Sequence, residues 1–71
     1  MEELPPDEKK VYEAMKRLGA TNPNSLKTAD DIARTANLPK GRVTNALTSM
    51  VGKGIAKRVA REKAAGYYLL K

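Results

Sequence analysis

The sequence has 71 residues, neither cysteine nor histidine, and 14 basic against 8 acidic side chains, a formal net charge of +6. A chain this short forms one small domain. Without Cys or His it cannot supply the usual zinc ligands, disulfides, thiol nucleophiles or Ser-His-Asp triads. We therefore expect a single domain over residues 1–71 that is not an enzyme and holds no metal or cofactor. No apolar run approaches the roughly 20 residues of a membrane span, so we also expect a soluble, cytoplasmic protein without membrane contacts.

The charges are unevenly distributed along the chain. Residues 1–31 carry seven acids and five bases, a net charge of −2, whereas residues 32–71 carry nine bases and one acid, a net charge of +8. From Ile32 to Arg61 there is no acidic side chain. A long stretch of one sign creates a field that attracts phosphate, although a basic composition that arose without such a partner is an alternative.

The first part of the chain predicts a flexible lead-in over residues 1–6 and then a helix. Proline suits the first turn of a helix, and the early acid Asp7 complements the positive end of the helix dipole. Apolar side chains then recur on one helical face, and Gly19 is expected to end the helix. The members of this face are Val11, Ala14, Met15 and Leu18.

A second, shorter helix is predicted over residues 29–36. The segment before it contains a turn cluster, Asn22-Pro23-Asn24-Ser25, and one apolar residue, Leu26, which predicts either a loop anchor or a very short strand. Thr28 is the expected N-cap, because two aspartates follow it in the first turn. The inner face of this helix would consist of Ala29, Ile32, Ala33 and Ala36.

A third helix is predicted from about residue 39 to residue 53, because Pro39 suits a first helical turn and Gly54 suits the position after a last turn. At 100° per residue, one side of this helix is apolar and the other side is small and polar. The expected buried side consists of Val43, Ala46, Leu47, Met50, Val51 and Gly54. The expected outward side consists of Gly41, Thr44, Asn45, Thr48 and Gly52.

Two strands are predicted after the third helix, over residues 55–61 and 66–70, with a turn between them. Val59 supplies β propensity in the first strand, and two tyrosines supply it in the second. Alternation leaves open which tyrosine points inward, because Tyr67 with Leu69 and Tyr68 with Leu70 are equally apolar pairs. The expected architecture is therefore α+β, with three helices followed by a two-stranded β-hairpin.

Two helices joined by a tight turn and followed by a basic hairpin form a winged helix-turn-helix. Residues 28–47, TADDIARTANLPKGRVTNAL, resemble the helix-turn-helix of prokaryotic regulators of the MarR and ArsR type. Residues 52–58, GKGIAKR, resemble the xxGLIxR pattern at the start of their wing. The resemblance covers roughly residues 8–70. It implies a transcriptional regulator or chromatin-type protein, cytoplasmic or nucleoid-associated, that binds double-stranded DNA with the third helix in the major groove and the wing, residues 55–70, on the backbone or minor groove.

The resemblance also implies which side chains of the third helix contact DNA: Lys40, Gly41, Arg42, Thr44, Asn45 and Thr48. Helical periodicity independently places four of these six outward. Asn45 can pair with adenine, whereas Thr44 and Thr48 can contact phosphate or a thymine methyl group. Such regulators often have arginine where Asn45 stands, so a strong preference for guanine is not expected.

The wing adds four basic side chains within seven residues, Lys57, Arg58, Arg61 and Lys63. We expect them to contact the DNA backbone or the minor groove, the alternative being that charge protects an edge strand from aggregation. On a two-stranded ribbon Lys57 and Arg61 would share one face, and Arg58 would lie on the other.

Other partners stay open from the sequence alone. A winged helix can be a protein-interaction module, as in the C-terminal domain of the replication protein A middle subunit, or can bind RNA, as in ribosomal winged-helix proteins. The chain also resembles Zα domains, which bind left-handed DNA, but Thr48 and Ala64-Ala65-Gly66 stand where those domains have tyrosine and prolines. No small-molecule ligand is evident, and a homodimer through the wing or the first helix is open because no heptad pattern specifies one.

Overall fold

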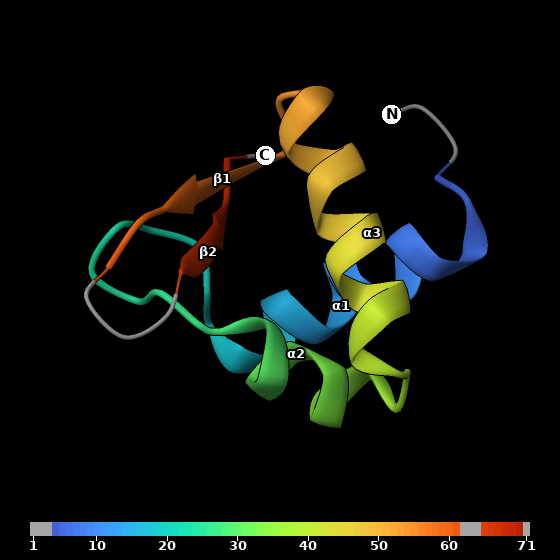
Figure 1. The fold of residues 1–71 in the computed structure, drawn as a ribbon. Coiled ribbons are helices and arrows are strands. Elements are labelled where there is room, and N and C mark those ends of the chain that lie inside the picture. The colour runs from blue at the N-terminus through green and yellow to red at the C-terminus, as the bar shows by residue number, and fades with distance from the viewer. Residues whose placement is uncertain (1–3, 62–64, 71) are drawn as a thin grey trace.

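The computed structural model describes residues 4–61 and 65–70 of the chain. Three helices, α1 (Pro6–Leu18), α2 (Ala29–Ala36) and α3 (Lys40–Gly52), precede the strands β1 (Ala56–Val59) and β2 (Gly66–Leu69). The helices pack against one another, and the hairpin of β1 and β2 extends to one side of them (Figure 1). The predicted α+β winged helix-turn-helix is therefore confirmed.

The ends of α1 and α2 follow from local signals in the sequence. α1 begins at Pro6, inside the predicted lead-in, and Gly19 adopts a left-handed φ of 76° after its last residue. Thr28 caps α2, because its Oγ1 accepts a hydrogen bond from the N–H of Asp31 at 3.2 Å. Asn37 then takes a φ of 58° and turns the chain into α3. Both ends of α2 and the end of α1 agree with the predicted boundaries, whereas α1 begins one residue inside the predicted lead-in.

The end of α3 sets the direction of the hairpin. Gly54 has a φ of 77°, which only glycine adopts without strain, and its N–H donates to the carbonyl of Val51 at 3.1 Å. The N–H of Ile55 donates to the carbonyl of Met50 at 2.9 Å. This pair of hydrogen bonds is a Schellman motif, which reverses the chain so that β1 can follow directly.

The core lies where the three helices meet the hairpin. Its largest fully buried side chains are Met15, Ile32, Leu47, Met50, Val11 and Val43, all from the predicted inner faces of the helices. One prediction was wrong: Val51 was expected in the core but is 37% exposed. Val51 lies about 80° from Val43 around the helix, at the edge of the apolar side, and only the middle of that side is covered.

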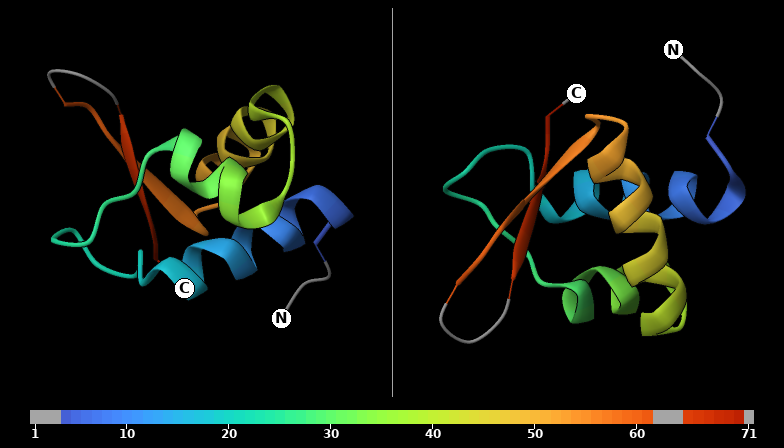
Figure 2. Two further views of the ribbon diagram at one scale, coloured as in Figure 1. Left: turned by 90° about the horizontal axis from the view of Figure 1, so that it is seen from below. Right: turned by 45° about the horizontal axis from the view of Figure 1, so that its top comes forward.

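The hairpin register shows which tyrosine points inward. Ala56 pairs with Leu69 and Arg58 pairs with Tyr67, so these four side chains share one face of the hairpin. Ala56, Tyr67 and Leu69 are buried in the core on this face, whereas Arg58 is exposed. Tyr67 is buried and Tyr68 is half-buried. Figure 2 shows that β1 and β2 lie beside the helices.

The loop between α1 and α2 covers the outer edge of β2. Lys27 and Tyr67 exchange two backbone hydrogen bonds, at 3.1 and 2.8 Å, and the N–H of Leu69 donates to the carbonyl of Ala20 at 2.8 Å. The very short strand expected near Leu26 is thus a single bridge at Lys27. These hydrogen bonds pair backbone groups of β2 that an open strand edge would leave unpaired.

Candidate nucleic-acid interface

The outward side of α3 is small and polar, as predicted. Its members are all exposed: Gly41, Thr44, Asn45, Thr48 and Gly52. The hydroxyl of Thr48 donates to the carbonyl of Thr44 at 2.9 Å, so the donor of this exposed side chain is already satisfied within the helix. No acidic residue lies in the first turn of α3. This side can therefore approach another molecule closely without presenting charge.

Three cations, two in α3 and one directly after its last residue, are paired with acids from other helices. Lys40 Nζ lies 3.2 Å from the carboxylate of Asp30 on α2. Arg42 donates two hydrogen bonds to Asp7 on α1, from Nε at 3.0 Å and from Nη2 at 2.6 Å. The sequence predicted Lys40 and Arg42 as contact residues but did not predict these partners, because their acids lie 10 and 35 residues away.

The contact between Asp7 and Arg42 has the geometry of a strong ion pair. Two parallel hydrogen bonds match the fork of the guanidinium to the two carboxylate oxygens. The hydrogen bonds, and then the charge, of Asp7 raise the pKa of Arg42 above its ordinary value. The guanidinium thus stays charged while the carboxylate next to it offsets that charge.

The third pair joins the start of α1 to the last turn of α3. Glu8 is only 6% exposed, and its carboxylate accepts hydrogen bonds from Lys53 Nζ at 3.0 Å and from Ser49 Oγ at 3.3 Å. The sequence analysis missed this cluster. A possible signal was the position of Glu8, one turn before Val11 on the apolar face of α1.

The described cations of the wing differ from those of α3. Lys57, Arg58 and Arg61 are exposed, and none of them belongs to an ion pair among residues 4–61 and 65–70. Lys57 and Arg58 lie on opposite faces of β1, as predicted. Arg61 follows the end of β1 at Val59, so strand alternation does not extend to it. Lys63 lies outside the described residues.

A shallow hollow of about 190 Å³ connects α3 to the wing. It is bounded by the first turn of α2, by Lys40 and Thr44 of α3, and by Ala65 and Tyr67 of the wing. Asp30 also lines this hollow. The outward side of α3 and the wing are therefore parts of one surface rather than two separate ones.

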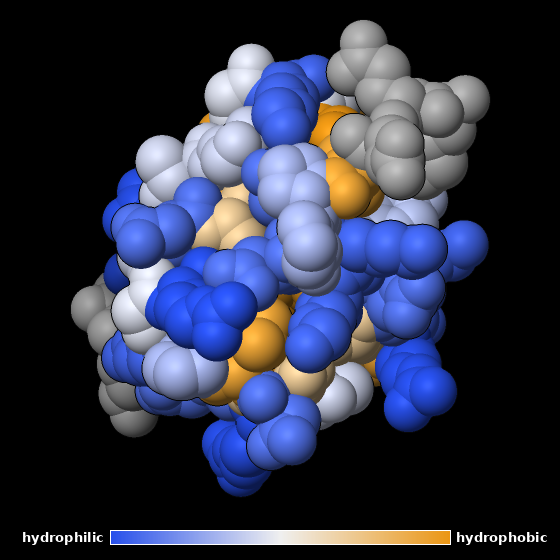
Figure 3. Space-filling model, turned by 90° about the vertical axis from the view of Figure 1, so that its right-hand side faces the viewer, coloured by the Kyte–Doolittle hydropathy of each residue, from blue (hydrophilic) through white to orange (hydrophobic). Residues whose placement is uncertain are grey.

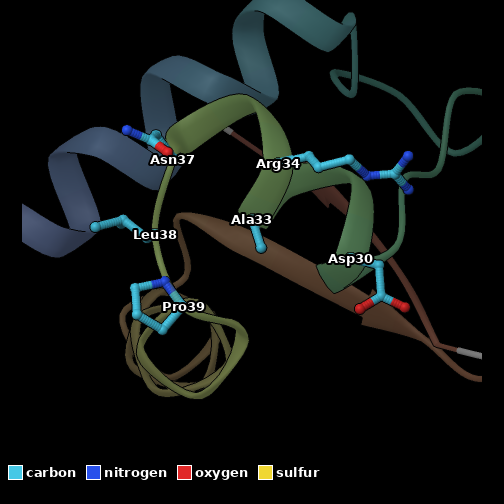
Figure 4. Close-up of a pocket in the computed structure, with 6 residues that line it drawn as sticks. All are labelled: Asp30, Ala33, Arg34, Asn37, Leu38 and Pro39. Carbon is cyan, nitrogen blue, oxygen red and sulfur yellow. The ribbon is translucent and has the colours of Figure 1, made fainter.

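A second, more open hollow of about 640 Å³ lies at the turn between α2 and α3 (Figure 4). Asp30 and Arg34 extend from α2 at one side, while Asn37, Leu38 and Pro39 form the other. The part of the chain that the structure describes contains no cluster of three acidic, histidine or cysteine side chains that could hold a metal ion. We interpret this hollow as the outer surface of the helix-turn-helix.

The side seen in Figure 3 is mostly hydrophilic, and its apolar areas are small and separate. Across the described ranges, no helix combines the length and apolarity that crossing a bilayer requires.

No protein-family model matches the sequence, and no curated protein matches it significantly. Solved structures do resemble it. The DNA-binding fragment of TubR from Clostridium botulinum has a TM-score of 0.79 at 13% identity, covering 96% of this chain and 85% of that one. A candidate DNA-binding protein from Ralstonia eutropha JMP134 has a TM-score of 0.78 at 20% identity, covering 97% and 86%. The likeness shows a shared fold.

The same fold also occurs inside an enzyme. Human N-acetylserotonin methyltransferase matches 90% of this chain with a TM-score of 0.67 at 16% identity, but the match covers only 19% of the enzyme's chain. The fold alone therefore does not assign a partner, and the argument for one must come from the surface of this chain.

Proposed function

We propose that this protein is a small regulator that binds double-stranded DNA, with α3 in the major groove and the wing on the backbone or in the minor groove. The observation that carries the proposal is that α3 and the wing line one hollow, while the small polar side of α3 and the described cations of the wing are all exposed. A helix with short side chains fits a groove about 12 Å wide, and exposed cations beside it suit the phosphates.

The contact residues divide into two groups under this proposal. Thr44, Asn45 and Thr48 face base edges, while Gly41 lets the backbone approach closely. The cations are Lys40, Arg42, Lys57, Arg58, Arg61 and Lys63. This division matches the general rule that phosphate contacts position a protein and base contacts specify the sequence.

Two further observations support the proposal. Both solved structures share this fold, and the TubR fragment is described as DNA-binding and the Ralstonia protein as a candidate DNA-binding protein. The resemblance of residues 28–58 to regulators of the MarR and ArsR type points the same way, and it favours a location in the cytoplasm, on the nucleoid.

A competition experiment tests this proposal against its alternatives. A fluorescently labelled duplex of mixed sequence is bound by the protein, and unlabelled duplex, single-stranded DNA, RNA and left-handed DNA compete in separate titrations. We expect the duplex in its ordinary B form to compete best. Stronger competition by RNA or left-handed DNA would reassign the substrate, and absence of binding to all four would favour a protein partner. Measuring the mass in solution with and without DNA tests for a homodimer.

A further inference from the structure

Two acids hold the cations at the end of α3 where the proposed DNA contacts begin. Asp30 lies 3.2 Å from Lys40 Nζ, and Asp7 holds both the Nε and the Nη2 of Arg42. Neither acid belongs to α3, and neither caps it, since the residue before its first turn is Pro39. The carboxylates therefore stand at the positions where the proposed function places phosphates.

We infer that Asp7 and Asp30 are specificity determinants of the proposed DNA site, an inference that rests on the proposed function. Each carboxylate forms an ion pair with a cation that a phosphate would otherwise contact. Together they lower the affinity for DNA of any sequence and leave the base-reading side chains of α3 unaffected.

The physical basis is the release of counterions when cations meet phosphates. A cation that is already paired with a carboxylate has little net charge to offer, so a phosphate must either displace the carboxylate or gain little. DNA that offers only its backbone is then held mainly by Lys57, Arg58 and Arg61, which have no acid partner in the described ranges. A duplex whose sequence also suits Asn45 gains additional base contacts. The ratio of the affinity for this duplex to the affinity for random DNA therefore rises.

Stability alone does not explain both pairs. The side chains of Lys40 and Asp30 are 64% and 63% exposed. Ion pairs this exposed contribute little to folding. Asp7 and Arg42 are less exposed, at 33% and 58%, and also connect α1 to α3, so their pair is tested separately for an effect on folding.

The test compares Asp7→Asn, Asp30→Asn and the wild type in binding a duplex of random sequence at several salt concentrations. We expect each variant to bind several-fold more tightly at low salt and to steepen the slope of log K against log salt by about 0.9, the contribution of one phosphate. Between about 50 and 200 mM salt, the advantage over the wild type should shrink by about 3.5-fold.

The matched control is Glu13→Gln, which changes the net charge equally at an exposed position of α1, beside Thr35 and Ala36 of α2. This control should raise the affinity for DNA less than Asp7→Asn or Asp30→Asn does, and it should leave the slope of log K against log salt unchanged. In an Arg42→Gln background, Asp7→Asn should behave like this control. Thermal unfolding of each variant establishes that the binding temperature lies well below its melting temperature.

The outcomes separate this inference from the proposed function. Suppose that the wild type binds DNA with a clear salt dependence. If Asp7→Asn and Asp30→Asn then have only the affinity and slope of Glu13→Gln, or are folded but bind DNA more weakly than the wild type, this inference is overturned and the proposed function stands. If neither the wild type nor the variants bind duplex DNA at low salt, both are overturned. A steeper slope that disappears in the Arg42→Gln background would support the role of Asp7.

Discussion

Glu8 of α1 and Lys53, the residue after α3, are joined by a hydrogen bond of 3.0 Å, which fixes the start of the first helix against the end of the third. The carboxylate is almost fully buried, whereas the lysine is 40% exposed. The orientation of the proposed reading helix therefore depends on a residue outside the helix-turn-helix.

Replacing Glu8 with alanine should destabilise the fold. The change removes the acceptor of both Lys53 and Ser49 and leaves their donors to water, so we expect a loss of about 1–2 kcal/mol in the free energy of unfolding. Urea denaturation measures it. Glu13→Ala, on the exposed side of the same helix, should change stability by less than about 0.5 kcal/mol. Equal midpoints for the two variants would contradict the assigned role of Glu8.

Gly41→Ala should separate folding from binding. A methyl group at Gly41 meets no atom within 4 Å, and alanine favours a helix, so the variant should be more stable by up to about 1 kcal/mol. If the backbone of α3 approaches DNA at this position, the same variant should bind duplex DNA several-fold more weakly. Gly52→Ala, which also has open space around it, is the control for stability. Unchanged DNA affinity in a stabilised Gly41→Ala would refute the close approach.

Asn45→Ala and Arg58→Ala should affect binding differently. Asn45 is proposed to read a base, so its loss should narrow the difference between preferred and random duplexes, by about 1–3 kcal/mol at the position it contacts. Arg58 is proposed to contact phosphate, so its loss should weaken all sequences alike. Selection of preferred sites from a random library, followed by titration of each variant, measures both effects. If both variants changed the affinities for preferred and random duplexes in the same way, the division into base-reading and phosphate-contacting residues would be wrong.

Gly66→Ala should destabilise the wing. A methyl group there would lie 2.7 Å from Cβ of Leu26, too close for any side-chain contact, so β2 or the loop that covers it must shift. We expect a cost of about 1–3 kcal/mol, measured by thermal unfolding. The Gly52→Ala variant again serves for comparison. A stability equal to that of the wild type would show that the contact between Leu26 and β2 is not maintained in solution.

The sequence predicted the elements better than their connections. Caps such as Thr28 and Gly54 are local signals, and the apolar faces of the helices follow from periodicity, so the boundaries and most of the core could be inferred. Val51 was misplaced because periodicity gives the direction of a side chain but not how far the neighbouring elements extend over it. The inward tyrosine needed the register of the hairpin, which depends on tertiary packing.

The candidate site was predicted in part. The exposed positions of α3 were predicted correctly, because they follow from the same helical periodicity as the apolar face. The acids that pair with Lys40 and Arg42 could not be foreseen, because Asp7 and Asp30 meet them only after three helices have packed. The charge of the basic half of the chain, +8 by sequence, is therefore partly offset on α3, and the offsetting acids come from the half that is acidic in sequence.

The most direct measurement for the central claim is the salt dependence of wild-type binding to duplex DNA. Of the six cations proposed to contact DNA, Lys40 and Arg42 are already paired with acids. The other four are those of the wing, and four phosphates give a slope of log K against log salt of about −3.6. A titration by fluorescence anisotropy at five salt concentrations determines this slope. A slope close to −3.6 is what the account predicts, and a slope near zero, or no binding at the lowest salt, would contradict it.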